Sequence, residues 1–129
     1  MTKKPLRIIV ADDNVDSADT MAACLRLRDW EVIAVYEALD IVPRAVEFMP
    51  HLVFLDIVMP KLDGYEVIRQ LRATPSVSDV KIVALTGLAR ADDKIKGLDA
   101  GFDGYLVKPT EPVEIYRLID DLLKPTDER

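Results

Sequence analysis

Five short apolar runs, separated by amphipathic stretches, constrain the fold of this 129-residue chain more than any other feature. The runs are nearly continuous and rich in Ile, Val and Leu, which is typical of strands covered on both faces. They occupy residues 6–11, 32–35, 52–55, 82–85 and 105–107. The amphipathic stretches between them have helical spacing, so the order predicts strands that alternate with helices.

The alternation predicts an α/β fold. Because crossovers between parallel strands are right-handed, we expect a five-stranded parallel sheet with helices on both faces. The simplest topology at this length is the doubly wound, flavodoxin-like order 2-1-3-4-5. The expected helices cover 15–28, 40–48, 63–74, 90–99 and 112–124. The second begins at Asp40 because Pro43 fits only in a first turn, and the fourth has the weakest apolar stripe.

Length and composition limit the class of protein. The size fits one domain spanning 1–129, with a core at about 5–125. The net charge is −6 without a Lys/Arg cluster, so direct nucleic-acid binding is disfavoured. Membrane insertion is not expected, because no apolar run approaches the roughly 20 residues that span a bilayer. The single cysteine and the lack of room for a signal peptide favour the cytoplasm.

Chemically distinctive residues follow four of the five runs. Asp12 and Asp13 follow the first, Asp56 the third, Thr86 the fourth and Lys108 the fifth. Open α/β sheets bind ligands beyond the carboxyl ends of their strands, so these groups are expected to meet in one crevice.

The meeting of three carboxylates favours a metal site. Their charges repel, and Mg²⁺ removes the conflict while leaving room for phosphate oxygens. Asp56 is the candidate nucleophile for an aspartyl phosphate, with Lys108 and Thr86 binding phosphoryl oxygens. Taken singly, each residue also has an ordinary interpretation: capping acids, a strand-end hydroxyl or a solvated lysine.

The chain resembles the receiver domain of two-component response regulators over essentially its whole length. The matching segments are VADDN at 10–14, LVFLDIVMP at 52–60, DG at 63–64, ALTG at 84–87, AG at 100–101 and YLVKP at 105–109. Each motif alone is weak, but their order and spacing together are highly specific.

The resemblance implies roles for individual residues. Asp56 would accept phosphate from a sensor histidine kinase or a histidine phosphotransfer protein. Asp13 and Asp56 would bind Mg²⁺ directly with the backbone carbonyl of Val58, and Asp12 would act through bound water. Thr86 and Lys108 would hold the phosphoryl group, and the bond from Lys108 to the following proline is expected to be cis.

The resemblance also implies a switch. Thr86 would move toward the phosphoryl group and Tyr105 would turn inward, although an ordinary edge aromatic is the competing interpretation of Tyr105. The face made by the fourth helix, last strand and fifth helix would change shape, and the chain would be a monomer or a weak homodimer through that face. The kinase is expected to dock near Val15, Ala18 and Met21 and at the loop after Lys108.

The sequence segments 14–18 and 85–87 resemble the corresponding segments of receivers that are attached to hybrid histidine kinases. The role as a stand-alone effector, a relay or a phosphate sink therefore stays open, as does an origin in a longer chain. In this family, the side chains at the positions of Val58 and Leu88 flank the path of the hydrolytic water. Both are apolar here and cannot orient that water, so we expect the access of water alone to set the lifetime of the phosphoryl group. His51, the sole histidine, receives no phosphoryl role.

Three alternative functions fit the sequence less well. A phosphohydrolase of this chemistry usually carries a second Asp two residues after the nucleophile, where this chain has Val58. A flavin carrier needs a phosphate loop after the first strand, where Asp12 and Asp13 would repel phosphate. An unphosphorylated docking module would not need the full set of site residues. We therefore expect a protein that catalyses only its own phosphorylation and dephosphorylation, not an enzyme acting on other substrates.

Overall fold

A computed structural model describes residues 5–57, 64–86 and 101–123 and confirms the expected sheet. Its five parallel strands are in the order β2-β1-β3-β4-β5. The strands are β1 (Arg7–Ala11), β2 (Glu31–Val35), β3 (Leu52–Asp56), β4 (Lys81–Thr86) and β5 (Gly104–Val107). The described helices are α1 (Val15–Arg26), α2 (Ile41–Phe48), α3 (Gly64–Arg72) and α5 (Pro112–Leu122), with 3₁₀ turns η1 (Ala38–Asp40) and η2 (Pro75–Val77). The expected fourth helix, 90–99, lies outside the described residues.

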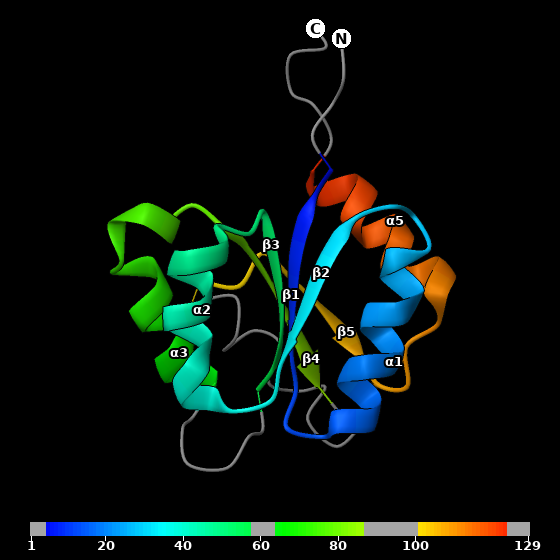
Figure 1. Cartoon of the computed structure of the whole chain (residues 1–129), viewed down its shortest axis with the longest axis horizontal. Coiled ribbons are helices and arrows are strands. Elements are labelled where there is room, and N and C mark those ends of the chain that lie inside the picture. Colours follow the sequence, from blue (N-terminus) through cyan, green and yellow to red (C-terminus); the bar gives the residue numbers. More distant parts are fainter. Residues whose placement is uncertain (1–4, 58–63, 87–100, 124–129) are drawn as a thin grey trace, which may run out of the picture.

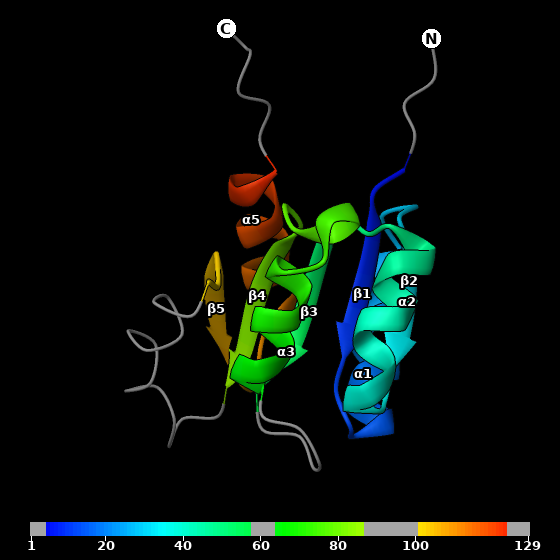
Figure 2. The same ribbon diagram turned by 90° about the vertical axis from the view of Figure 1, so that its left-hand side faces the viewer.

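The helices cover the sheet in two layers. Helices α1 and α5 lie on one face, and α2 and α3 lie on the other (Figure 1). Seen from the side, α2 lies over β1 and β2, whereas α3 lies over β3 and β4 (Figure 2). The sheet is thus buried from both sides, as its continuous apolar strands predicted.

Helix α1 is two residues shorter than expected. The prediction ran to Arg28, but the helix ends at Arg26 and Leu27 is its C-cap. The amides of Arg28 and Asp29 donate to carbonyls three residues back, which tightens the last turn. Asp29 then adopts φ 63°, which turns the chain toward β2. The apolar pattern continues through Leu27, so it could not reveal this stop.

Helix α2 starts close to the predicted residue, but the predicted side-chain cap at Asp40 does not form. Asp40 is the N-cap residue, yet its side chain makes no capping hydrogen bond because it is helical and ends η1. Pro43 lies in the first turn, as required. The third helix was predicted to end at Thr74, but α3 ends two residues earlier, at Arg72.

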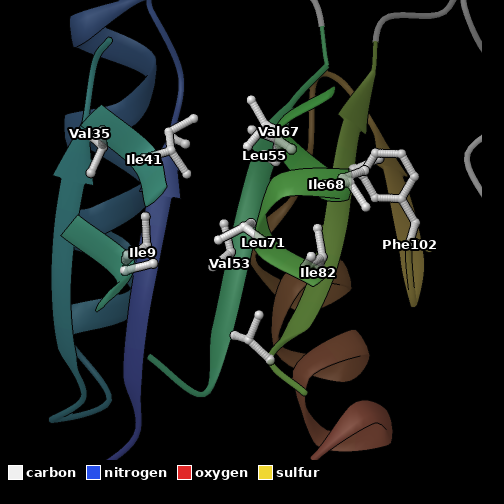
Figure 3. Packing of buried hydrophobic residues seen from close by; sticks show 14 of the residues in the cluster. Ile9, Val35, Ile41, Val53, Leu55, Val67, Ile68, Leu71, Ile82 and Phe102 are labelled. Carbon is white, nitrogen blue, oxygen red and sulfur yellow. The ribbon is translucent and has the colours of Figure 1, made fainter. Parts of the chain in front are cut away.

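The core consists of two clusters separated by the sheet. Alternate strand residues point to opposite faces. Ile9, Val53 and Ile82 therefore join the cluster beneath α2 and α3 (Figure 3), whereas Ile8 and Phe54 join the cluster beneath α1 and α5. This alternation decides on which side of the sheet each strand-end side chain emerges.

All five strands run in one direction, so their carboxyl ends share one edge of the sheet. At the opposite end of the molecule β1 begins and α5 finishes (Figure 1). Of the helices that the structure describes, none combines the length and apolar character needed to cross a bilayer.

Candidate functional site

Three carboxylates meet at the carboxyl edge of the two central strands. Asp12 and Asp13 follow β1, and Asp56 ends β3, its neighbour in the sheet. One oxygen from each lies within 4.8 Å of the others. The structure thus brings together the acids that the sequence predicted would meet.

Burial singles out the same region. Among the described residues, the buried polar or charged ones are Asp12, Asp56 and Thr86, with exposed fractions of 2%, 8% and 4%. Asp and Thr are mostly found on protein surfaces, and a buried carboxylate requires a partner. Asp13, in contrast, is exposed.

Lys108 is a partner of both buried acids. Its Nζ donates to Asp12 Oδ2 at 2.8 Å and to Asp56 Oδ2 at 3.2 Å. The Lys108 backbone N–H donates to the carbonyl of Thr86 at 2.7 Å, which holds the residue just beyond β5. The ammonium therefore joins the last strand to the two central strands.

Competing influences set the pKa of Lys108. Burial of the ammonium lowers the pKa, but the hydrogen bond to Asp12 and the negative charges of Asp56 and Asp12 outweigh burial. The pKa is therefore raised above its ordinary value, and the side chain is positively charged at neutral pH.

The turn after β1 is held by its own side chains. Asp12 N donates to the carbonyl of Val35, and Asp12 Oδ1 accepts the Asn14 N–H at 3.0 Å. Asn14 is the N-cap of α1, and its Oδ1 accepts the Ser17 N–H at 3.0 Å. This capping role was missed, although an Asn just before a helical pattern is a standard N-cap signal.

The acid cluster fits a hard divalent cation. Its donors are all carboxylate oxygens, which suit Mg²⁺ better than softer metals. Asp12, Asp13 and Asp56 would hold the ion, with the exposed Asp13 on the solvent side. Val58, whose carbonyl was expected to be a further ligand, lies outside the described residues, as does Leu88.

The side chains of Thr86 and Tyr105 lie on the face of the sheet that α2 and α3 cover. Strand pairing sets Ala84 beside Tyr105 and Thr86 beside Val107, so Thr86 and Tyr105 are diagonal neighbours. Tyr105 is partly buried against the cluster under α2 and α3. Their proximity is compatible with coupled movement, which itself stays a prediction.

A groove of about 630 Å³ adjoins the site. It is lined by Asp12 after β1, by residues of α1 such as Met21, by Lys108 and Pro109 after β5, and by the start of α5. Met21 lines this groove and Val15 is exposed, so a partner can reach both, and docking of a kinase there stays a prediction. The inclusion of Ala18 was wrong, because Ala18 is completely buried against the sheet.

The cis geometry expected between Lys108 and Pro109 is present. The start predicted for the third helix, at residue 63, lies outside the described residues. Within them, α3 begins at Gly64.

Comparison with known proteins gives a consistent result. Residues 8–120 match the family model described as response regulator receiver domain. The chain is 33% identical over 121 residues to the DNA-binding dual master transcriptional regulator RpaA of Synechocystis, covering 94% of this chain and 50% of that protein. It is 36% identical over 118 residues to the transcriptional regulatory protein PrrA of Mycobacterium leprae, covering 92% and 50%. The chain spans about half the length of the curated relatives it matches.

Solved structures agree with the family match. A response regulator from Chloroflexus aurantiacus superposes with a TM-score of 0.88 at 27% identity, covering 95% of this chain and 100% of that chain. The receiver domain of the sensor histidine kinase PA1611 from Pseudomonas aeruginosa has a TM-score of 0.82 at 30% identity, covering 92% and 97%. That receiver carries a magnesium ion coordinated in its active-site cleft.

Proposed function

The chain belongs to the response regulator receiver domain family of two-component signalling, and we propose from its site that it is a phosphorylation-dependent switch with Asp56 as the phosphoacceptor. One observation carries the proposal: the ammonium of Lys108 binds both buried acids from a distant strand. Such a constellation gives no packing advantage, because each buried charge costs desolvation energy.

The proposed reaction is an in-line transfer to a carboxylate oxygen of Asp56. That oxygen forms a bond to phosphorus while the bond between phosphorus and the donor breaks, and the donor leaves with the bonding electrons. Lys108 lies 3.2 Å from Asp56 Oδ2 and can follow the charge onto the phosphoryl group. Magnesium held by the acid cluster would neutralise phosphoryl oxygens in the transition state. The hydroxyl of Thr86 would donate to a further oxygen.

The site favours Asp56 over the other acids as the nucleophile. Asp12 is committed on both oxygens, one to the Asn14 N–H and one to Lys108. Asp13 is exposed, so a nucleophile there would be open to solvent, whereas Asp56 is buried. Asp56 lies on the central strand β3, between the acids of β1 and the hydroxyl of β4.

Incubation with a phosphorylated histidine kinase, or with a small acyl phosphate and Mg²⁺, tests the proposal. We expect intact-mass analysis to find one added phosphoryl group in the wild type and none in Asp56→Asn. Asp79→Asn, which changes an exposed acid before β4, is the matched control and should be labelled like the wild type. Labelling that persists in Asp56→Asn would reject this acceptor.

We propose that the partner is a histidine kinase or histidine phosphotransfer protein that docks over the groove beside α1. The proposed output is a change in the surface around Tyr105 that controls a downstream protein. We propose no substrate other than the chain itself, so phosphate monoesters should not be turned over in a steady-state screen. Multiple turnover of such esters would instead support a phosphohydrolase.

A further inference from the structure

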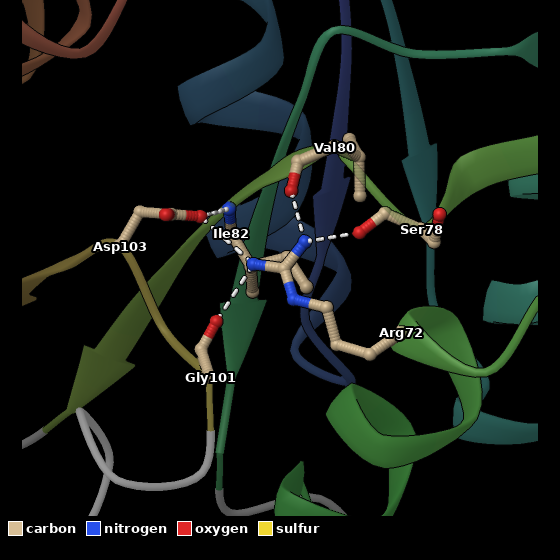
Figure 4. Close-up of polar contacts among 6 residues, drawn as sticks. All are labelled: Arg72, Ser78, Val80, Ile82, Gly101 and Asp103. Carbon is tan, nitrogen blue, oxygen red and sulfur yellow. Dashed lines mark hydrogen bonds and ion pairs between the residues drawn. The ribbon is translucent and has the colours of Figure 1, made fainter.

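A single arginine ties together three separate segments behind the site. Arg72, the last residue of α3, donates from Nη1 to the carbonyls of Ser78 and Val80, and from Nη2 to the carbonyl of Gly101 and to Asp103 Oδ2 (Figure 4). The contacts to Gly101 and Asp103 measure 2.7 and 2.9 Å. All four N–H bonds of the two terminal nitrogens are thus used, which only the planar fork of Arg allows.

Asp103 extends this contact into the sheet. Its Oδ2 also accepts the backbone N–H of Ile82 at 2.8 Å, and its own N–H donates to the carbonyl of Ile82 at 2.7 Å. Ile82 belongs to β4, and Asp103 directly precedes β5. The start of β5 is therefore held against one specific residue of β4 by its backbone and by its side chain.

Strand β5 has particular need of such a contact. It has four residues, all only partly buried, and it is the edge strand of the described sheet, where β4 is its one neighbour. Register is specified weakly where burial does not distinguish the two sides of a strand. A shift by one residue would move each side chain by about 3.3 Å and transfer it to the other face of the sheet.

The register of β5 decides where Lys108 lies. In the observed register Thr86 pairs with Val107, and the next residue places its ammonium between Asp12 and Asp56. We propose that Arg72, acting through Asp103, is a positioning residue that sets the register of β5 and so holds Lys108 in the phosphoryl site. The inference deepens the proposed function and rests on it for its kinetic consequence.

The test compares two arginines of the same helix. Arg72→Gln removes the fork, whereas Arg69→Gln removes the same charge from an exposed residue that pairs only with Glu66 among the described residues. Asp103→Asn, which keeps the side-chain shape, is the milder second variant in case Arg72→Gln does not fold. All variants are studied as the full chain, well below their unfolding midpoints measured by circular dichroism.

The first readout does not depend on phosphorylation. Hydrogen exchange of the Lys108 amide, which donates to Thr86, should be accelerated about tenfold or more in Arg72→Gln and unchanged in Arg69→Gln. Unchanged protection at Lys108 in both Arg72→Gln and Asp103→Asn would overturn the inference.

The second readout is the initial rate of Asp56 labelling by a small acyl phosphate. Arg72→Gln should lower it about tenfold to a hundredfold, as expected for a displaced catalytic group. In a Lys108→Ala background the same change should alter the rate by less than about twofold, because the affected group is already absent. An equal loss in both backgrounds would mean that Arg72 acts by another route and would reject the proposal.

The two readouts also separate the inference from the function on which it rests. If the wild type is not labelled at Asp56, the proposed function fails. The exchange rate at Lys108 then still decides whether Arg72 sets the register of β5.

Discussion

Single side chains at this site differ in how far the sequence predicts them. Asp56 and Lys108 each follow an apolar run, so their place at the sheet edge follows from the strand pattern alone. Arg72 gives no such signal, because an Arg near the end of an amphipathic helix usually lies in solvent. Its partners are mostly backbone carbonyls, which every residue carries, and only the folded chain brings them together.

His51 is a second side chain whose role the sequence does not reveal. Its Nδ1 accepts the backbone N–H of Arg7 at 3.0 Å, so the neutral ring carries its proton on Nε2. Partial burial, and then the positive charge of Arg7, lower the pKa of His51. Lys81, whose backbone N–H donates to the carbonyl of His51, and Asp79 lie near the same end of the sheet.

Protonation of His51 should therefore weaken the fold. Because the folded-state pKa is lowered, the stabilisation is complete above about pH 6.5 and is lost as the pH falls through the folded-state pKa. We expect an NMR titration midpoint below about 6.5 and a loss of less than about 1 kcal/mol. His51→Gln, whose amide oxygen accepts at any pH, should reduce the dependence of Tm on pH between about 5 and 7. A midpoint at or above the ordinary value would contradict this account.

At the scale of helices and strands, their order could be predicted and their ends could not. Apolar periodicity reports which residues face the core, and this depends on the whole helix or strand. The end of α1 depends instead on Asp29 at positive φ, and the missing Asp40 cap depends on the preceding 3₁₀ turn. Helix α5 begins with a reciprocal contact between Glu111 and Glu114, which the apolar pattern that predicted a helix from residue 112 does not reveal.

Gly64 sets how closely α3 approaches β3. A Cβ at this residue would lie 2.6 Å from the Cα of Ile57, which is backbone and has little freedom to move. Gly64→Ala should lower the free energy of unfolding by about 1–3 kcal/mol, as overpacking does. Gly104→Ala is the control, since its Cβ would meet the Leu118 side chain at an ordinary 3.5 Å. Urea denaturation measures both, and equal losses would show that close approach at Gly64 is not the cause.

At the scale of the whole molecule, the topology explains why the site could be predicted at all. In a parallel sheet every strand carries its carboxyl end to the same edge, so residues distant in sequence are brought together without any information about side-chain contacts. The sequence pattern could not specify which acid binds Lys108. That choice depends on distances within the crevice, where Lys108 binds the two buried acids.

Binding of Mg²⁺ should stabilise the entire domain. The acids repel one another, and a ligand that binds only the folded chain raises its stability, by about 2.7 kcal/mol at a hundred times Kd. We expect Tm to rise with Mg²⁺ in the wild type and in Asp79→Asn, and to rise much less in Asp13→Asn. Thermal scans at constant ionic strength measure the rise in Tm. An equal rise in all three proteins would place the ion elsewhere.

The start of β1 and the end of α5 lie away from the crevice, which matters for fusion to other polypeptides. Strand β1 starts and α5 finishes at the end of the molecule opposite the carboxyl edge of the sheet. A polypeptide fused to either end would therefore leave the approach to Asp56 open. The domain is therefore suited to fusion with different neighbouring domains, because the neighbours can change while the same crevice stays accessible.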